Sequence, residues 1–326
     1  MPAIGRTYRL AEPCRIRRED NSVRIERPDS GPVRIPITDI RDLVTFDHVD
    51  INTAALSLLS RNGVTLHVLD HYGNHAGHFS PSDSMASASV VRRQVDLTAA
   101  PDTRLPIARS LVLATAHNLR WVLDTELLDA PLATLREALP TCSDTDELMG
   151  QEGNFRRTAW AVLDTQLPAW LRLEGRTRRP PTNAGNAFIS YLNALVYTRV
   201  LTALRTTPLH PAIGFLHSDT DRRRNTLALD LSEPLKPLFT ERLLKRAASQ
   251  KLLKPSDFET EVGKASLSKD GRKKVAALMK NELATTVYHR SLKRKVSYEE
   301  IIHLEALKLV RTCLEETPYK PFRPWW

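Results

Sequence analysis

The spacing of apolar residues changes near residue 80, and this change constrains the fold more than any other feature. Before it, apolar residues alternate in short runs such as SVRIERP, PVRIPIT and DLVTFDHVDI, which are separated by turn-forming residues and predict strands. From Val90 onward they recur three and four positions apart, as in LPIARSLVLATAHNLRWVLDTELL, which predicts helices. We therefore expect an α+β fold, with a small N-terminal β-rich domain followed by a large all-α domain.

The same patterns set the expected domain boundaries. Within the β-rich part, the pattern predicts one helix at Thr53–Arg61 that ends at Asn62-Gly63. The small polar stretch SPSDSMASAS is typical of a linker or of the start of a helix. We predict a β domain over residues 1–80, a linker over 81–90 and a helical domain over 91–326. A chain of 326 residues is long enough for two hydrophobic cores.

Apolar runs and cysteines indicate the compartment. No run reaches the roughly 18 apolar residues of a membrane-spanning helix. The first twenty residues are polar and charged where a signal peptide would be apolar. Cys14, Cys142 and Cys313 are odd in number, lie far apart and form no CxxC pair, so we expect reduced packing residues. These observations predict a cytoplasmic protein with no membrane partner.

Positive charge is concentrated in one segment. The chain has a formal net charge of +9, and residues 241–295 alone contain 15 Lys and Arg against 6 Asp and Glu, a surplus equal to that of the whole chain. Such a segment is typical of a polyanion-binding protein or of a solvated helical surface. Its two clusters provide candidate phosphate contacts, namely Arg272, Lys273, Lys274, Lys293 and Arg294.

Glu152 is the first candidate for chemistry. Ser143 followed by Asp146 resembles a capping box, which predicts that a helix begins shortly before Glu152. Glu152 then projects from the apolar face of this helix, four residues after Leu148, where a charge is costly unless it is paired or metal-bound. A buried ion pair with Arg156 is the structural alternative to a functional role.

The segment GFLHSDTDRRRNTLALDLSEPLKP, residues 214–237, contains the other candidates. We expect TLALD to be extended and Ser232 to begin a helix with Glu233 in its first turn. Asp230 and Glu233 are three residues apart and can face the same space. A hydrogen-bonded core histidine is the alternative for His217, and a helix-dipole interaction is the alternative for Glu233.

One histidine and three carboxylates favour a particular metal. An oxygen-rich set with one imidazole suits Mg²⁺ or Mn²⁺ better than Zn²⁺. Arg222, Arg223 and Arg224 lie close by in sequence and can hold phosphates. A metal that neutralises phosphate charge, together with arginines, is the arrangement that phosphodiester chemistry needs.

Several motifs in order resemble one family over nearly the whole chain. MGQEGNFRRTAW, PPTNAGNAFISYLNALVY, GFLH, LALDLSEPLKP and the tail YKPFRPWW are similar to the CRISPR-associated adaptation integrase (Cas-one) family, in a type I branch. The region ITDIRDLVTFDHVDINTAALSLLSRNGVTLHVLDHYGNHAGHF matches its β domain. The sequence departs from the family in its Arg-rich loop at SDTDRRRN and in lacking the lysine that relatives often place just before Asn118.

The resemblance implies a function and a site. It implies a metal-dependent DNA endonuclease and integrase of spacer acquisition, with the metal held by Glu152, His217 and Glu233 and with Asp230 close by as a fourth catalytic residue. Arg156 and Arg157 would contact DNA. It also implies a homodimer formed largely through the β domains, and a complex with a second, smaller adaptation protein that inserts short foreign DNA at a CRISPR repeat.

Other interpretations remain at this point. A non-catalytic DNA-binding scaffold would explain the basic segment, with Glu152 and Glu233 in structural ion pairs. A metal-dependent nuclease unrelated to spacer integration would explain the site. His67, His71, His75 and His78 crowd into twelve residues, but the turn at Tyr72-Gly73-Asn74 predicts a hairpin rather than a metal site.

Overall fold

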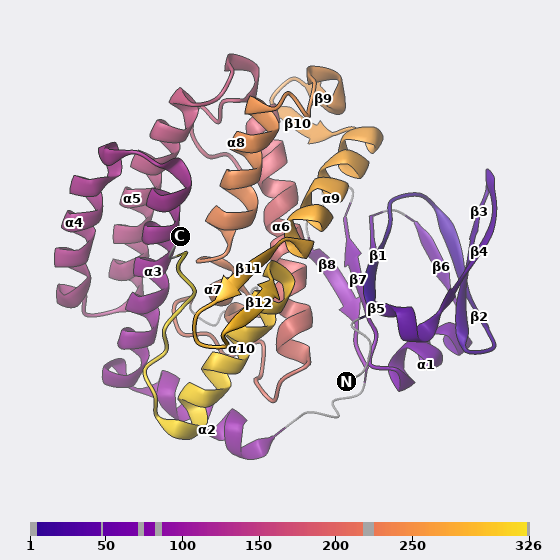
Figure 1. The fold of residues 1–326 in the computed structure, drawn as a ribbon, viewed down its shortest axis with the longest axis horizontal. Helices are drawn as coiled ribbons and strands as arrows, with labels where there is room; N and C mark the ends of the chain where they lie inside the picture. Colours follow the sequence, from indigo (N-terminus) through magenta and orange to yellow (C-terminus); the bar gives the residue numbers. More distant parts are fainter. Residues whose placement is uncertain (1–4, 47, 71–74, 82–86, 218–224, 325–326) are drawn as a thin grey trace. The chain divides into compact units, whose positions relative to one another are not determined.

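The computed structural model describes residues 5–46, 48–70, 75–81, 87–217 and 225–324. The chain divides into two compact units, residues 1–84 and 85–326, and the division falls within the predicted linker (Figure 1). The first unit is rich in strands and the second is mainly helical, as the apolar spacing predicts. The helical unit begins with α2 at Ala88, so the end of the predicted linker is already helix.

Two four-stranded sheets build the first unit. One has the order β1-β5-β7-β8, with β1, β5 and β7 parallel and β8 antiparallel to β7. The other has the order β4-β3-β2-β6, in which β2, β3 and β4 form an antiparallel meander. The strands are β1 (Arg6–Leu10), β2 (Cys14–Glu19), β3 (Ser22–Arg27), β4 (Ser30–Pro36), β5 (Ile40–Thr45), β6 (Val49–Ile51), β7 (Thr65–Leu69) and β8 (His75–Phe79).

Helix α1 connects the two sheets. It spans Thr53–Arg61, as predicted, because the Asn52 side chain caps its start by accepting a hydrogen bond from the Ala55 amide. Alternating strand residues and the apolar face of α1 form one core, which includes Ile16, Val23 and Leu59. This unit therefore has its own hydrophobic core.

The predicted hairpin at the histidines is confirmed. His67 on β7 pairs across the strands with His78 on β8, and the His75 ring lies 6.1 Å from that of His67 between centroids. His71 and the Tyr72-Gly73-Asn74 turn lie outside the described residues. The hairpin brings three histidines together, but no group of three or more His, Cys, Asp or Glu among the described residues is arranged to hold a metal ion.

Helices dominate the second unit. Figure 1 shows α3, α4 and α5 side by side, and α6 packs against α7 and α10. A π-helical turn, η5 (Pro237–Glu241), joins α7 to α8. The helices are α2 (Ala88–Ala99), α3 (Pro101–Leu123), α4 (Asp129–Ala138), α5 (Thr145–Thr165), α6 (Ala184–Arg205), α7 (Thr226–Ser232), α8 (Arg242–Ser249), α9 (Lys269–Ala284) and α10 (Tyr298–Glu315).

Two short hairpins interrupt the helical pattern. β9 (Phe258–Glu261) pairs with β10 (Lys264–Leu267), and β11 (Thr286–His289) pairs with β12 (Arg294–Ser297). Helix α9 ends at Ala284, because the β-branched and aromatic run Thr286–His289 favours a strand. The unit is therefore mostly, rather than entirely, helical.

Helix α6 is long and apolar enough to cross a bilayer by length and composition alone. However, 78% of its most apolar window is buried inside the protein. An apolar helix that is enclosed on most sides is typical of the centre of a large helical core.

All three cysteines are free and buried, as predicted.

Candidate active site

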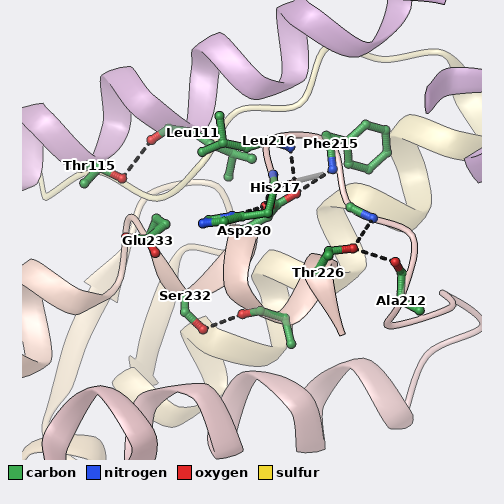
Figure 2. Close-up of polar contacts among 12 residues, drawn as sticks. Leu111, Thr115, Ala212, Phe215, Leu216, His217, Thr226, Asp230, Ser232 and Glu233 are labelled. Carbon is green, nitrogen blue, oxygen red and sulfur yellow. Dashed lines mark hydrogen bonds and ion pairs between the residues drawn. The ribbon is translucent and has the colours of Figure 1, made fainter. Parts of the chain in front are cut away.

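The buried carboxylate of Asp230 organises the loop that contains His217. It lies on α7 with no exposed surface. Its Oδ2 accepts hydrogen bonds from the backbone amides of Phe215 (2.5 Å) and Leu216 (2.9 Å), and its Oδ1 accepts one from the amide of His217 at 3.0 Å (Figure 2). Hydrogen bonds to a charged acceptor are stronger than neutral ones, so this carboxylate sets the path of the loop.

Gly214 allows that carboxylate to approach. A Cβ atom on Gly214 would lie 2.8 Å from Asp230 Oδ2 and 2.8 Å from Thr226 Oγ1, closer than real side chains tolerate. The Gly214 amide instead donates to Thr226 Oγ1 at 3.0 Å. From α3, Arg104 Nε donates to the Phe215 carbonyl at 2.7 Å and holds the loop on its other side. The first residue of the GFLH motif thus has a steric explanation.

His217 has a defined orientation. Its Nδ1 lies 2.7 Å from Asp230 Oδ1, and because that carboxylate already accepts amide hydrogens, Nδ1–H is the donor. Nε2 is then the nitrogen left for a ligand or a proton. Burial acts to lower the pKa of His217, but the hydrogen bond to Asp230 and the charge of Glu233 raise it above its usual value.

Glu152 and Glu233 meet at one guanidinium. Arg156 Nε donates to Glu152 Oε1 at 2.8 Å along α5, and Arg156 Nη2 donates to Glu233 Oε2. All three side chains are buried. Burial acts to lower the pKa of Arg156, but Glu152 and Glu233 raise it, so the guanidinium stays charged. The two carboxylates, 81 residues apart in sequence, therefore lie within the span of one side chain.

Glu233 has a second cationic partner. Lys236, three residues later, donates from Nζ to Glu233 Oε1. Although burial acts to raise the pKa of Glu233, Lys236 and Arg156 together lower it to about 2. The charge of Glu233 in turn raises the pKa of His217, so His217 and Glu233 share one electrostatic environment. Arg156 thus links Glu152 to Glu233, Asp230 holds His217, and the charge of Glu233 acts on His217.

Comparisons with known proteins identify the family. Residues 8–281 match the family model of CRISPR associated protein Cas1. The chain belongs to the Cas1 family. It is 34% identical over 324 residues to the CRISPR-associated endonuclease Cas1 2 of Moorella thermoacetica, covering 98% of this chain and 100% of that one.

Solved structures show the same fold for this Cas1 chain. A CAS1 protein from Thermotoga maritima superposes with a TM-score of 0.87 at 28% identity, covering 98% of this chain and 100% of that chain. A casposase bound to integration product has a TM-score of 0.85 at 19% identity, covering 98% and 96%. The second likeness is one of fold alone. The predicted β-rich region followed by a helical domain is confirmed.

Two local predictions about this Cas1 site are wrong. TLALD is not extended: Thr226–Ser232 is helix α7, and Ser232 does not cap a helix start but donates from Oγ to the Ala228 carbonyl one turn back. Glu233 follows the end of α7 instead of lying in a first turn. The cap of α5 is Asp144, whose side chain accepts from the Glu147 amide at 2.8 Å, one residue later than predicted.

The residues predicted to contact DNA differ from one another in their exposure and in their partners. Arg157 is exposed on α5 and donates to Asn154 Oδ1. Lys274 donates from Nζ to Asp257 Oδ1 at 2.6 Å, and Arg294 pairs with Glu300. Arg222, Arg223 and Arg224 lie outside the described residues. The remaining candidates lie on or near the basic segment, with Arg272 half-buried and Lys273 and Lys293 exposed.

Glu241 is a site residue that the sequence reasoning missed. It is 1% exposed in the η5 turn, accepts a hydrogen bond from Trp160 Nε1 at 3.3 Å and adds its charge to those that act on Arg156. The sequence feature that could have identified it is an acidic residue among the apolar residues of LFTERLL.

Asn118 is a second missed residue. It is fully buried on α3, and its Nδ2 donates to the Pro234 carbonyl at 2.7 Å and to the Phe322 carbonyl at 3.0 Å. Pro234 directly follows Glu233, so Asn118 links the C-terminal segment to the backbone of the site. No local pattern predicts this bridge, because its partners lie 116 and 204 residues away.

Proposed function

We propose that this Cas1 chain is a metal-dependent DNA endonuclease and integrase of CRISPR spacer acquisition. In this reaction a DNA 3′-hydroxyl attacks a phosphodiester of the CRISPR repeat, and the same site hydrolyses branched DNA when water is the nucleophile. The observation that carries the proposal is the convergence of Glu152 and Glu233 on one guanidinium, with His217 oriented beside them.

The donor set fits Mg²⁺ or Mn²⁺. Two carboxylates and one imidazole are ligands that such ions accept, and the buried carboxylates need a compensating cation. Among the described residues no three His, Cys, Asp or Glu side chains are arranged as an ion-binding group. Arg156 and Lys236 supply the compensating charge to Glu233. Glu152, His217 and Glu233 would hold the ion in exchange for these two side chains. When bound, it would neutralise phosphate charge and lower the pKa of the attacking hydroxyl.

The chain's own residues then have separate roles. Asp230 is a positioning residue, since it fixes the His217 ring through Nδ1 and the His217 backbone through its amide. Arg156 and Lys236, once displaced from the carboxylates, are cations close to the reacting phosphate. A guanidinium there can contact two phosphate oxygens at once.

Two exposed glycines lie close to Glu152 in sequence. Gly150 and Gly153 flank it on α5, are exposed, and a Cβ atom at either position would meet nothing within 4 Å. Glycine inside a helix costs stability relative to alanine, so two of them next to a buried acid favour a surface that a substrate backbone approaches closely. We infer that DNA reaches the site over this part of α5.

The wider assembly follows from the family. We infer that the chain acts in the cytoplasm as a homodimer formed largely through its β unit, together with a second, smaller adaptation protein. DNA, as foreign fragments and as the CRISPR repeat, is its substrate. The surplus of positive charge in residues 241–295 supports this and predicts DNA binding that weakens steeply with salt.

The test is a joining assay. Purified protein is incubated with labelled branched DNA and a supercoiled plasmid, in Mn²⁺ or EDTA, with and without the second adaptation protein. Glu152→Ala, His217→Ala and Glu233→Ala should each abolish metal-dependent joining, and Arg311→Gln, an exposed paired arginine on α10, should not. Full joining by Glu152→Ala would overturn the site assignment. Cleavage without joining would indicate an unrelated nuclease, and binding without either would indicate a scaffold.

A further inference from the structure

Glu241 has a buried carboxylate oxygen without a hydrogen bond. The residue ends the π-helical turn η5 and is 1% exposed. Its Oε1 accepts a hydrogen bond from Trp160 Nε1 at 3.3 Å, whereas its Oε2 has no hydrogen-bond partner among the residues that the structure describes. A buried carboxylate oxygen has lost its hydration, which costs free energy unless a protein group replaces the water. This cost favours a role in which Oε2 gains a partner.

Arg156 is the cation best placed to reach this oxygen. Glu152, Arg156 and Trp160 follow one another at intervals of four residues along α5, so they share one face of the helix. The Arg156 guanidinium lies over the Trp160 ring, with Cζ 5.8 Å from the ring centroid, and the N–H of that ring donates to Glu241. Burial acts to lower the pKa of Arg156, but the charge of Glu241 is among those that raise it. Trp160 therefore connects Arg156 to Glu241.

Arg176 is the other cation on which Glu241 acts. Burial lowers the pKa of Arg176 to about 10, although the charge of Glu241 opposes this shift. Both terminal nitrogens of Arg176 already have acceptors, because Nη1 donates to Asn186 Oδ1 at 3.0 Å and Nη2 donates to Ser190 Oγ at 2.9 Å. Neutral groups on α6 thus hold the Arg176 side chain, and Oε2 of Glu241 stays available to Arg156.

Metal binding creates the need for such an acceptor. Without metal, Arg156 donates to both Glu152 and Glu233. An ion held by these two carboxylates would take both acceptors, and a buried cation that loses its partners is strongly destabilising. Lys236, the other cation on Glu233, is partly exposed and can turn to solvent, but Arg156 is only 8% exposed. The displaced guanidinium therefore needs a carboxylate inside the protein.

We propose that Glu241 is a positioning residue that receives Arg156 when a divalent ion occupies the two glutamates of the site. One edge of the guanidinium then donates to Glu241 Oε2, and the other edge is left for a phosphate oxygen. The same arginine thus compensates the two acids without metal and faces the DNA with metal. The inference rests on the proposed function and deepens it, because it names the group that fixes Arg156 after metal binding.

The first test measures metal binding without DNA. Mg²⁺ is titrated into the purified protein while tryptophan fluorescence is recorded for the wild type, Glu241→Gln and Trp160→Phe. In the wild type the ion should change the emission, because Arg156 moves relative to the Trp160 ring, and Trp160→Phe should lose this change. Glu241→Gln keeps an acceptor for Trp160 but lacks the charge, so half-saturation should need about tenfold more Mg²⁺, the factor that one hydrogen bond to a charged group contributes.

The matched control is Glu315→Gln. It removes the same charge from an exposed ion pair on α10 and should respond to Mg²⁺ like the wild type. An equal loss of Mg²⁺ affinity in this variant would indicate a general charge effect and would overturn the inference.

A double-mutant cycle shows whether Glu241 acts through Arg156. Mn²⁺ affinity is measured from the metal-dependent rise in melting temperature of the wild type, Glu241→Gln, Arg156→Met and the variant with both changes. The loss caused by Glu241→Gln should disappear in the Arg156→Met background. A carboxylate that binds or attracts the ion itself would instead cause the same loss in both backgrounds. The fluorescence titration does not need the Arg156 variant, so it tests the inference even if that variant fails to fold.

The remaining outcomes separate this inference from the proposed function. Equal half-saturating Mg²⁺ concentrations in the wild type and Glu241→Gln would overturn the inference, and so would an equal loss in both backgrounds of the cycle. A metal response that Glu152→Ala abolishes and Glu241→Gln leaves intact would overturn only the role of Glu241 and leave the proposed function standing. A wild-type protein without any metal response would overturn both.

Discussion

The Nδ1 atom of His217 lies 2.7 Å from the Oδ1 atom of Asp230, and the same carboxylate accepts the backbone amide of His217. One buried carboxylate therefore fixes both the ring and the main chain of a single residue. The orientation of the other ring nitrogen, Nε2, is therefore fixed as well. A ligating histidine whose other nitrogen is held by a carboxylate is the arrangement that orients imidazole ligands in metal enzymes.

Asp230→Asn should lower the pKa of His217. The wild-type pKa is raised, so His217 stabilises the fold fully below its ordinary value of about 6.5 and loses that contribution as pH rises through the raised value. The variant should lose this pH dependence and about 1–3 kcal/mol of stability. NMR titration of the His217 ring and urea unfolding between pH 5 and 9 measure both effects. An unchanged titration would refute the role of Asp230.

Arg156→Met should destabilise the helical unit strongly in the absence of metal. It leaves Glu152 and Glu233 buried without their shared guanidinium, and breaking a buried pair in this way costs about 3–5 kcal/mol. Mn²⁺ should then raise the melting temperature of the variant more than that of the wild type, because the ion replaces the missing charge. Arg311→Met, in an exposed pair, should change stability by less than about 1 kcal/mol. Equal metal responses would argue against an ion between the two glutamates.

Asp257→Asn should lower the stability of the protein mainly above about pH 4. Burial acts to raise the pKa of Asp257, but hydrogen bonds from Lys274 and from the Lys254 amide lower it. A lowered carboxylate pKa contributes stability above the unfolded value of about 3.9, and this is lost as pH falls through the folded value. The stability difference between wild type and variant should therefore shrink below about pH 4. Urea midpoints from pH 3 to 7 measure it, and a constant difference would contradict the ion pair.

Gly153→Ala should separate stability from activity. Alanine in this exposed helical position should raise the free energy of unfolding by about 0.5–1 kcal/mol, since its Cβ meets nothing. Joining should nevertheless decrease if DNA reaches Glu152 over this part of α5, as proposed, because the methyl group would then stand in its path. Thr134→Ala, exposed on α4, also improves helix propensity and should leave joining unchanged. A stabilised Gly153→Ala with full joining would place the DNA elsewhere.

The division into a β-rich and a helical unit was predictable because apolar spacing reflects which face of each element is buried. Helix α7 was not, because Thr226–Ser232 is buried on nearly every side and shows no apolar stripe, so its Leu-Ala-Leu-Asp-Leu run resembles a strand. Asp230 and Glu233, three residues apart, both act on the pKa of His217. Glu241 and Asn118 depend on distant partners, and spacing along the chain says nothing about those.

Asn118 also bears on how the protein matures. Its amide bridges the carbonyls of Pro234 and Phe322, so the connection between the C-terminal segment and the backbone next to Glu233 forms only after residue 322 has been synthesised. A nascent chain that has not yet reached that residue has every acidic side chain of the site but lacks this closure. Synthesis of these acidic residues and formation of the bridge at Asn118 are therefore separate events in the life of the chain.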